Sequence, residues 1–142
     1  MTKIKFRTPS TYDLAVAKTG VPFTYVDADG VTWGTFIVSL FNLDSKFVRI
    51  ALERFARENK EVVEKLEGEY VRGVFTFVNV CLHGWDIVDE NGKPVPFTRQ
   101  NAFDYFEAID DQTMFNALVE FAQDKSNFKH DPRATKDEEA KN

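Results

Sequence analysis

Two runs of strand-forming residues flank an Asp29-Gly30 pair, and this arrangement constrains the fold more than any other feature of the sequence. An Asp-Gly pair supplies the backbone conformation with positive φ that a tight hairpin turn requires. We therefore predict a β-hairpin over residues 21–41, preceded by an extended arm over residues 1–20. The strand-forming residues on which the hairpin rests are Phe23, Tyr25, Trp33, Phe36, Ile37 and Val38.

Helical periodicity replaces the strand pattern after the hairpin. Asp44 or Ser45 can accept a free backbone N–H at a helix start, and apolar residues then recur every three or four positions. We predict a helix over residues 46–57. The same spacing continues from Val63 to Trp85 and favours one long helix. A strand is the alternative over residues 74–82, which begin with a β-branched and aromatic run.

Two shorter helices are expected towards the C-terminus, one capped by Thr98 and one by Asp110 and Asp111. Residues 129–142 are almost wholly polar, which predicts a disordered tail. The predicted fold class is α+β, with an N-terminal β-hairpin followed by a mainly α-helical bundle of about four helices. Residues 21–128 would form one globular domain.

Charge and composition exclude several function classes. The chain has 18 basic and 23 acidic residues, a net charge of −5, and the two signs are interleaved. Nucleic-acid-binding proteins concentrate basic charge, so we expect no nucleic-acid partner. No segment supplies the roughly 20 apolar residues of a membrane span. The N-terminus lacks a secretory signal and Cys81 is the single cysteine, so we expect a cytoplasmic protein with no membrane partner.

Chemically reactive residues form no recognisable constellation. Gly30 and Gly92 lie in segments that partly resemble calcium loops, but both segments lack the oxygen ligands at their ends. Cys81 and His83 cannot complete a zinc site, because His130 is the only other histidine. The sequence has no nucleophile elbow and no glycine-rich phosphate loop. We therefore expect no catalytic residue, no metal and no cofactor.

Large aromatic residues near turns and element ends are the remaining candidates for function. Each one either covers the core or anchors a partner protein, and both interpretations stay open. These candidate partner contacts are Trp33, Trp85, Phe97 and Phe128.

Residues 84–102 combine a Gly-Trp pair, a short acidic turn, a Gly-x-Pro-x-Pro-Phe sequence, and a Thr that starts a helix with Asn at its third position. This combination resembles a pattern in the tail assembly chaperones of long-tailed bacteriophages. Asp44-Ser45 before a helix and the closing Asn127-Phe128 are weaker matches to the same family. The residues of the central pattern are Gly84, Trp85, Asn91, Gly92, Pro94, Pro96, Phe97, Thr98 and Asn101.

A structural role explains this pattern without any chemistry. Trp85 would cover the core where the long helix ends, while Asn91-Gly92 turns the chain and the two prolines keep it extended. Thr98 would cap the next helix with Phe97 in the staple position. Asn101 stands where a capping box has Glu or Gln, so the reciprocal box is incomplete.

The resemblance implies a protein that binds the tape measure protein, keeps it soluble and helps to recruit tail-tube subunits. It implies action in the cytoplasm of the infected bacterium and absence from the mature virion. Family members are also made in a longer, frameshifted form, for which residues 129–142 would be the replaced segment. Association of identical copies into a homo-oligomer is a further alternative that stays open. The alternative function is a structural component of the phage tail or neck that is retained in the virion.

Overall fold

The hairpin is the first part of a three-stranded antiparallel sheet in the computed structural model, which describes residues 3–134. Strands β1 (Val21–Val26) and β2 (Thr32–Val38) pair along their length. At the turn, the Asp27 carboxylate accepts the backbone N–H groups of Asp29 and Val31, both at 2.9 Å, and Gly30 has a φ of +80°. The hairpin predicted over residues 21–41 is confirmed, and its second strand ends at Val38.

The third strand, β3 (Leu82–Trp85), pairs with β2 and was not predicted. Phe36 lies opposite Phe23 on one side and opposite Trp85 on the other. Phe36 and Val38 are buried on one face of β2. On the other face, the hydroxyl groups of Thr35 and Thr24 form a hydrogen bond of 2.8 Å. The sheet therefore has one core face and one more exposed face, as the alternation of side chains along its strands requires.

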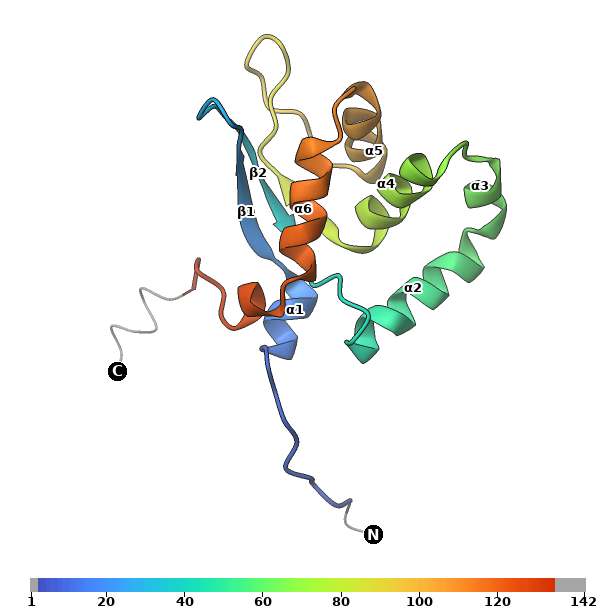
Figure 1. Cartoon of the computed structure of the whole chain (residues 1–142), viewed down its shortest axis with the longest axis vertical. Helices are drawn as coiled ribbons and strands as arrows, with labels where there is room; N and C mark the ends of the chain where they lie inside the picture. Colours follow the sequence, from blue (N-terminus) through green and yellow to red (C-terminus); the bar gives the residue numbers. More distant parts are fainter. Residues whose placement is uncertain (1–2, 135–142) are drawn as a thin grey trace.

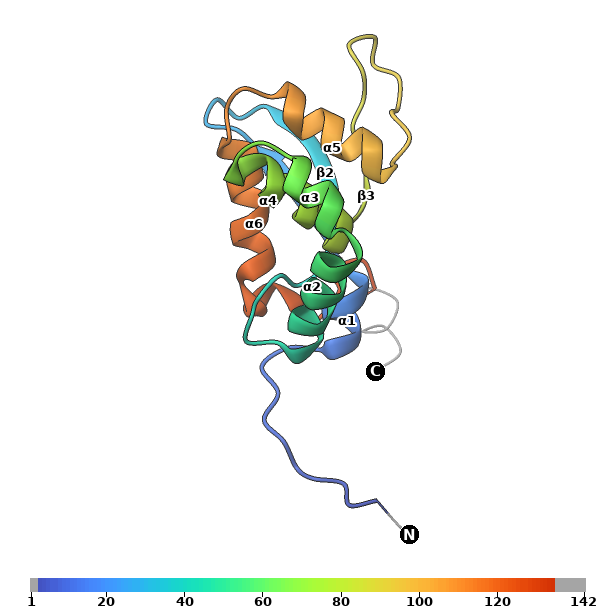
Figure 2. The same ribbon diagram turned by 90° about the vertical axis from the view of Figure 1, so that its right-hand side faces the viewer.

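Helices cover the core face of the sheet, while the segment before α1 extends away from the body (Figures 1 and 2). α6 packs against β1, and α5 packs against α4. α2 runs obliquely away from the end of α6, packs against α4 and leads into α3 (Figure 1). The helices are α1 (Leu14–Thr19), α2 (Lys46–Glu58), α3 (Lys60–Lys65), α4 (Glu69–Val80), α5 (Arg99–Ala108), α6 (Thr113–Gln123) and the 3-10 helix η1 (Lys125–Phe128).

Two buried clusters form the core. The larger one joins the sheet to α4, α5 and α6 through phenylalanine rings: Phe36 contacts Phe106 at 5.9 Å between centroids, and Phe115 contacts both Phe106 and Phe77 at 5.5 Å. The smaller one joins α1, β1, α2 and η1. Its buried members are Ala17, Val21, Leu40, Val48 and Phe128. Edge-to-face and tilted aromatic pairs therefore connect the elements of the larger cluster.

The predicted α+β class is confirmed, with six α-helices among the described residues instead of about four. α2 confirms the helix predicted over residues 46–57 and extends it by one residue. Its N-cap is Ser45, but the Ser45 hydroxyl bonds to Tyr12 at 2.7 Å rather than to a helix N–H. Burial of this serine at the α1–α2 contact explains the difference.

The prediction of one long helix over residues 63–85 is wrong. Gly68, with a φ of +92°, separates α3 from α4, and α4 ends at Val80. The Cys81 carbonyl then accepts the Ser39 N–H at 2.9 Å, and the chain continues as β3. The strand alternative over residues 74–82 is also wrong for residues 74–80, which are helical.

The extended arm ends at Asp13 rather than at residue 20. The Asp13 carboxylate accepts the Val16 N–H at 3.1 Å and caps α1, which buries Ala17. At the other end of the chain, Arg133 donates to the Gly20 carbonyl at 2.9 Å, so the start of the polar tail contacts the body. Residues 135–142 of the predicted disordered tail lie outside the described residues.

Two glycine substitutions provide a matched test of this fold. We expect Gly20→Ala to lower the free energy of unfolding by about 2 kcal/mol, because φ is +96° and the new Cβ would lie 2.9 Å from the Val38 carbonyl oxygen. Gly73→Ala in α4 meets no atom within 4 Å, so we expect a gain of about 0.5–1 kcal/mol from helix propensity. Urea unfolding of both variants measures these changes, and equal effects would contradict the geometry.

Candidate functional site

Trp85 covers one end of the larger core cluster. Its indole Nε1 donates to the Val95 carbonyl at 2.8 Å, which fastens the following loop to the end of β3. Its ring makes edge contacts with Phe97 and Tyr105, both at 5.5 Å between centroids, and with Phe36 at 6.4 Å. Trp85 and Phe97 are both half-buried. These contacts give both residues a packing role at the edge of the core.

The loop after Trp85 is a small hairpin. The Asp89 carboxylate accepts the N–H groups of Asn91 at 2.8 Å and Lys93 at 3.0 Å, and Gly92 has a φ of +77°. Val88 and Pro94 form a β-bridge, so the turn predicted at Asn91-Gly92 is confirmed. The preceding Gly84 lies in β3 opposite Ile37.

Thr98 begins α5 as predicted, because its hydroxyl accepts the Asn101 N–H at 2.9 Å. Asn101 does not complete a capping box. Its side-chain amide instead donates to the Pro96 carbonyl at 2.9 Å, which holds the proline segment against the helix start. Arg99 lies over the Phe97 ring and donates to the carbonyls of Val78 and Leu82. Arg99 thus positions α5 against α4 and β3, while the pattern residues Thr98 and Asn101 fix the start of α5.

A small polar cluster contains Ser39, Cys81 and His83. The His83 imidazole pairs with the Ser39 hydroxyl, whereas a Cys–His nucleophile would need it to pair with the Cys81 thiol. The His83 Nε2 atom lies 2.9 Å from the Ser39 hydroxyl, and that hydroxyl donates to the Cys81 carbonyl at 3.3 Å. Burial raises the pKa of the Cys81 thiol to about 12. Partial desolvation, together with the positive charge of Arg99, lowers the pKa of His83. A thiol with that pKa supplies almost no thiolate at neutral pH.

The four predicted partner contacts do not converge on one surface. Phe128 is wholly buried in the smaller core cluster, so its assignment as a partner contact is wrong: its position close to a polar tail concealed its packing. Trp33 is 53% exposed and lines a cavity beside the hairpin turn. Trp85 and Phe97 pack on one another at β3, an edge strand of the sheet, whereas Trp33 belongs to the central strand β2.

An apolar surface that the sequence did not predict lies between α2, α4 and α6. Three neighbouring cavities of about 330, 400 and 370 Å³ share lining residues: Phe41 joins the first to the third, Thr76 the first to the second, and Leu52 the second to the third. We call this surface the α2–α4–α6 groove. Its other apolar lining residues are Leu43, Phe55, Ala56, Val63, Phe77, Phe115 and Val119.

The groove has few charges and an exposed apolar rim. Leu43 is 65% exposed at the end nearest α6. Lys60, Glu64 and Arg72 are the charged side chains along it. A concave surface of this kind suits the apolar side chains of another protein better than a polar small molecule.

Comparisons of the chain with protein-family models, with curated proteins and with solved structures gave no match. Among residues 3–134, no helix has both the length and the apolar character needed to cross a membrane. Within the same residues, no group of three or more His, Cys, Asp or Glu side chains is placed to hold a metal ion.

We expect Trp85→Ala to lower the free energy of unfolding by about 3 kcal/mol, because it removes three ring contacts and the bond to Val95. Trp85→Phe keeps a ring but loses the hydrogen bond, and should cost about half as much. Chemical denaturation measures both. An unchanged midpoint for Trp85→Ala would mean that the residue does not support the core.

We expect Cys81 to react with a thiol reagent at pH 8 more than about a hundredfold more slowly in the folded protein than in urea, because the buried thiol stays protonated. Absorbance of the released thiolate follows the reaction. Comparable rates in both states would show that the core around Cys81 opens readily.

Proposed function

We propose that this protein is a tail assembly chaperone of a long-tailed bacteriophage, and that it binds apolar helical segments of the tape measure protein in the α2–α4–α6 groove. Binding would keep the tape measure soluble in the cytoplasm of the infected bacterium. The chaperone would also help to recruit tail-tube subunits and would leave before the virion matures.

The groove is the observation that supports this proposal. An amphipathic helix places apolar side chains at successive turns on one face, and partner grooves receive these side chains as separate anchors. Three adjoining cavities lined by Phe41, Leu52 and Thr76 match that mode of recognition. Long apolar helices are also what a chaperone of a tape measure protein has to shield from water.

The packing of residues 84–101 agrees with a protein that acts by binding. These residues fasten a loop and start a helix, through the bonds of Trp85 to Val95 and of Asn101 to Pro96 and Thr98. The resemblance to the chaperone family rests on the same residues. Their role in the proposed function is to hold α5 against α4, which lines the groove.

Co-expression with the tape measure protein encoded nearby tests the proposal directly. We expect the tape measure to be soluble and to co-purify only when this protein is present. If the tape measure stays insoluble and this protein is found in purified particles, the alternative function, a structural component of the tail or neck, replaces the chaperone.

A matched pair of substitutions locates the binding surface. Leu43→Glu puts a charge at the groove rim, and we expect it to weaken tape measure binding by about tenfold, because the charge would have to be desolvated in the complex. Val88→Glu alters a similarly exposed residue, 51% against 65%, in the loop between β3 and α5 and should leave binding unchanged. Pull-down titrations compare the two. If both variants bind the tape measure protein equally well, the groove is excluded as the binding surface.

A further inference from the structure

The cavity beside Trp33 has a volume of about 510 Å³ and lies between the hairpin turn, the end of α5 and the start of α6. No residue lines both this cavity and the α2–α4–α6 groove. We call it the hairpin cavity. Trp33 forms its most exposed aromatic wall, and the Tyr105 hydroxyl contacts the Met114 sulfur at 3.8 Å within it. Its apolar lining residues are Tyr25, Ala28, Trp33, Tyr105, Ile109 and Met114.

Three carboxylates surround the hairpin cavity, and its lining contains no lysine or arginine. Asp27 accepts the Trp33 indole N–H at 2.7 Å, and Asp111 accepts the Thr113 hydroxyl. These bonds lower the pKa of both carboxyl groups, so both remain charged at neutral pH. The carboxylate of Asp29 takes part in no hydrogen bond or ion pair with the described part of the chain. The cavity is thus aromatic inside and acidic at its rim.

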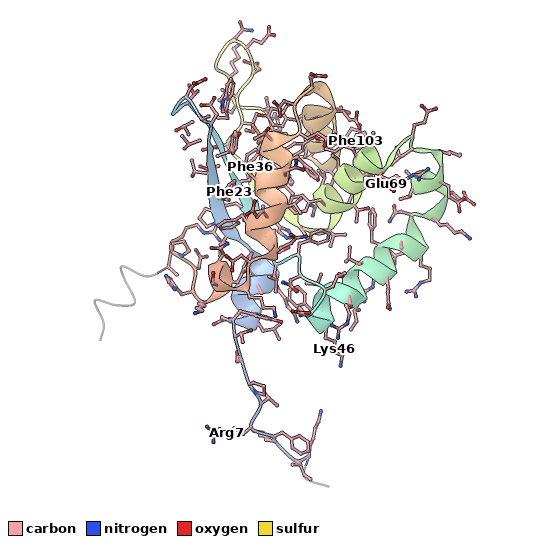
Figure 3. All side chains as sticks on the ribbon, viewed as in Figure 1. Arg7, Phe23, Phe36, Lys46, Glu69 and Phe103 are labelled. Carbon is pink, nitrogen blue, oxygen red and sulfur yellow. The ribbon has the colours of Figure 1, made fainter. Side chains whose placement is uncertain are left out.

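The arm, residues 3–13, has the complementary character. Basic and apolar residues alternate from Lys3 to Arg7. Ile4 and Phe6 are 70% and 76% exposed, the highest values among the large apolar side chains of residues 3–134. The three basic side chains make no ion pair within the described residues. Figure 3 shows Arg7 on the arm, well away from the body of the protein.

We propose that the arm of one copy of this protein docks in the hairpin cavity of a second copy. Ile4 and Phe6 enter the aromatic cavity, while Lys3, Lys5 and Arg7 face the acidic rim. Apolar burial supplies affinity, and the opposite charges set the direction and steer the encounter. This contact does not depend on the proposed function, because the hairpin cavity and the α2–α4–α6 groove share no lining residue.

The fold directs the arm to a neighbour rather than to its own cavity. The base of the arm is held by the Asp13 N–H, which donates to the Phe128 carbonyl at 2.9 Å, and by the Tyr12 hydroxyl, which lies 2.7 Å from the Ser45 hydroxyl. From there the arm leaves at the end of the molecule opposite the hairpin turn and α5 (Figures 1 and 2). Arm and cavity at opposite ends make a head-to-tail contact, which builds chains or rings of copies.

Sedimentation of the full chain from about 10 µM to about 1 mM tests for self-association over the range expected of a short arm that orders on binding. We expect the mean mass to rise with concentration. Association should weaken several-fold between about 50 mM and about 500 mM salt, because ion pairs at the rim are screened. A monomer at every concentration would overturn the proposal.

Two variants separate the arm from the cavity. Phe6→Asp alters an exposed arm residue, and Asp29→Lys alters an exposed turn residue whose carboxylate has no partner among residues 3–134, so both should keep the wild-type thermal midpoint. We expect each variant alone to associate at least about tenfold more weakly than the wild type. Val62→Asp, at an exposed position on α3, is the matched control and should associate normally.

Mixing the two variants gives the decisive result. The intact arm of Asp29→Lys fits the intact cavity of Phe6→Asp, so the mixture should form a one-to-one dimer that does not grow further. Absence of this dimer, or normal self-association of either variant alone, would overturn the head-to-tail contact. Association that only the Val62→Asp control disrupts would place the interface on α3 and also contradict the proposal.

Discussion

Three successive backbone N–H groups after β2 connect the sheet to three different helices. Within the hairpin, β2 pairs with β1, but beyond Val38 the chain leaves the sheet and its donors bond to three other elements. The bonds, of 2.8–2.9 Å, run from Ser39 to Cys81, from Leu40 to Ala17 and from Phe41 to Ala122. Buried backbone donors must find acceptors, so the short segment can be buried only when the ends of α1, α4 and α6 are all in place. Elements far apart in sequence are thereby made mutually dependent.

The same segment connects the core to the groove. Leu40 is buried in the smaller cluster, whereas Phe41 packs against both clusters and contacts Phe77 at 5.6 Å between ring centroids. Phe41 also lines two of the three groove cavities. The backbone bond to Ala122 and the ring contact with Phe77 place Phe41 at the junction of α4 and α6. The floor of the groove is therefore continuous with the core beneath it.

Local signals in the sequence were enough for the hairpin, α2 and the start of α5, because Asp29-Gly30, helical spacing and the Thr98 cap all act over a few residues. The break at Gly68 and strand β3 were missed for a different reason. The spacing of three and four continues through both, and β3 exists only because β2, more than forty residues earlier, offers an edge. The groove could not be predicted either, since Phe41, Leu52 and Thr76 meet only in the tertiary structure.

The two sides of the groove differ in how firmly they are held. α4 and α6 contribute Phe77, Phe115 and Leu118 to the larger cluster, so that side cannot move without disturbing the core. On the other side, α2 buries only Val48, and α3 buries no residue. A ring contact of 5.5 Å between Phe55 and Phe75 is the aromatic link from α2 to α4. Local stability follows the number of buried contacts, so α2 and α3 can adjust their distance from α4 at low cost. In the proposed function, such a groove would accommodate helices whose anchor side chains differ in size, which a chaperone covering successive segments of one long partner would need.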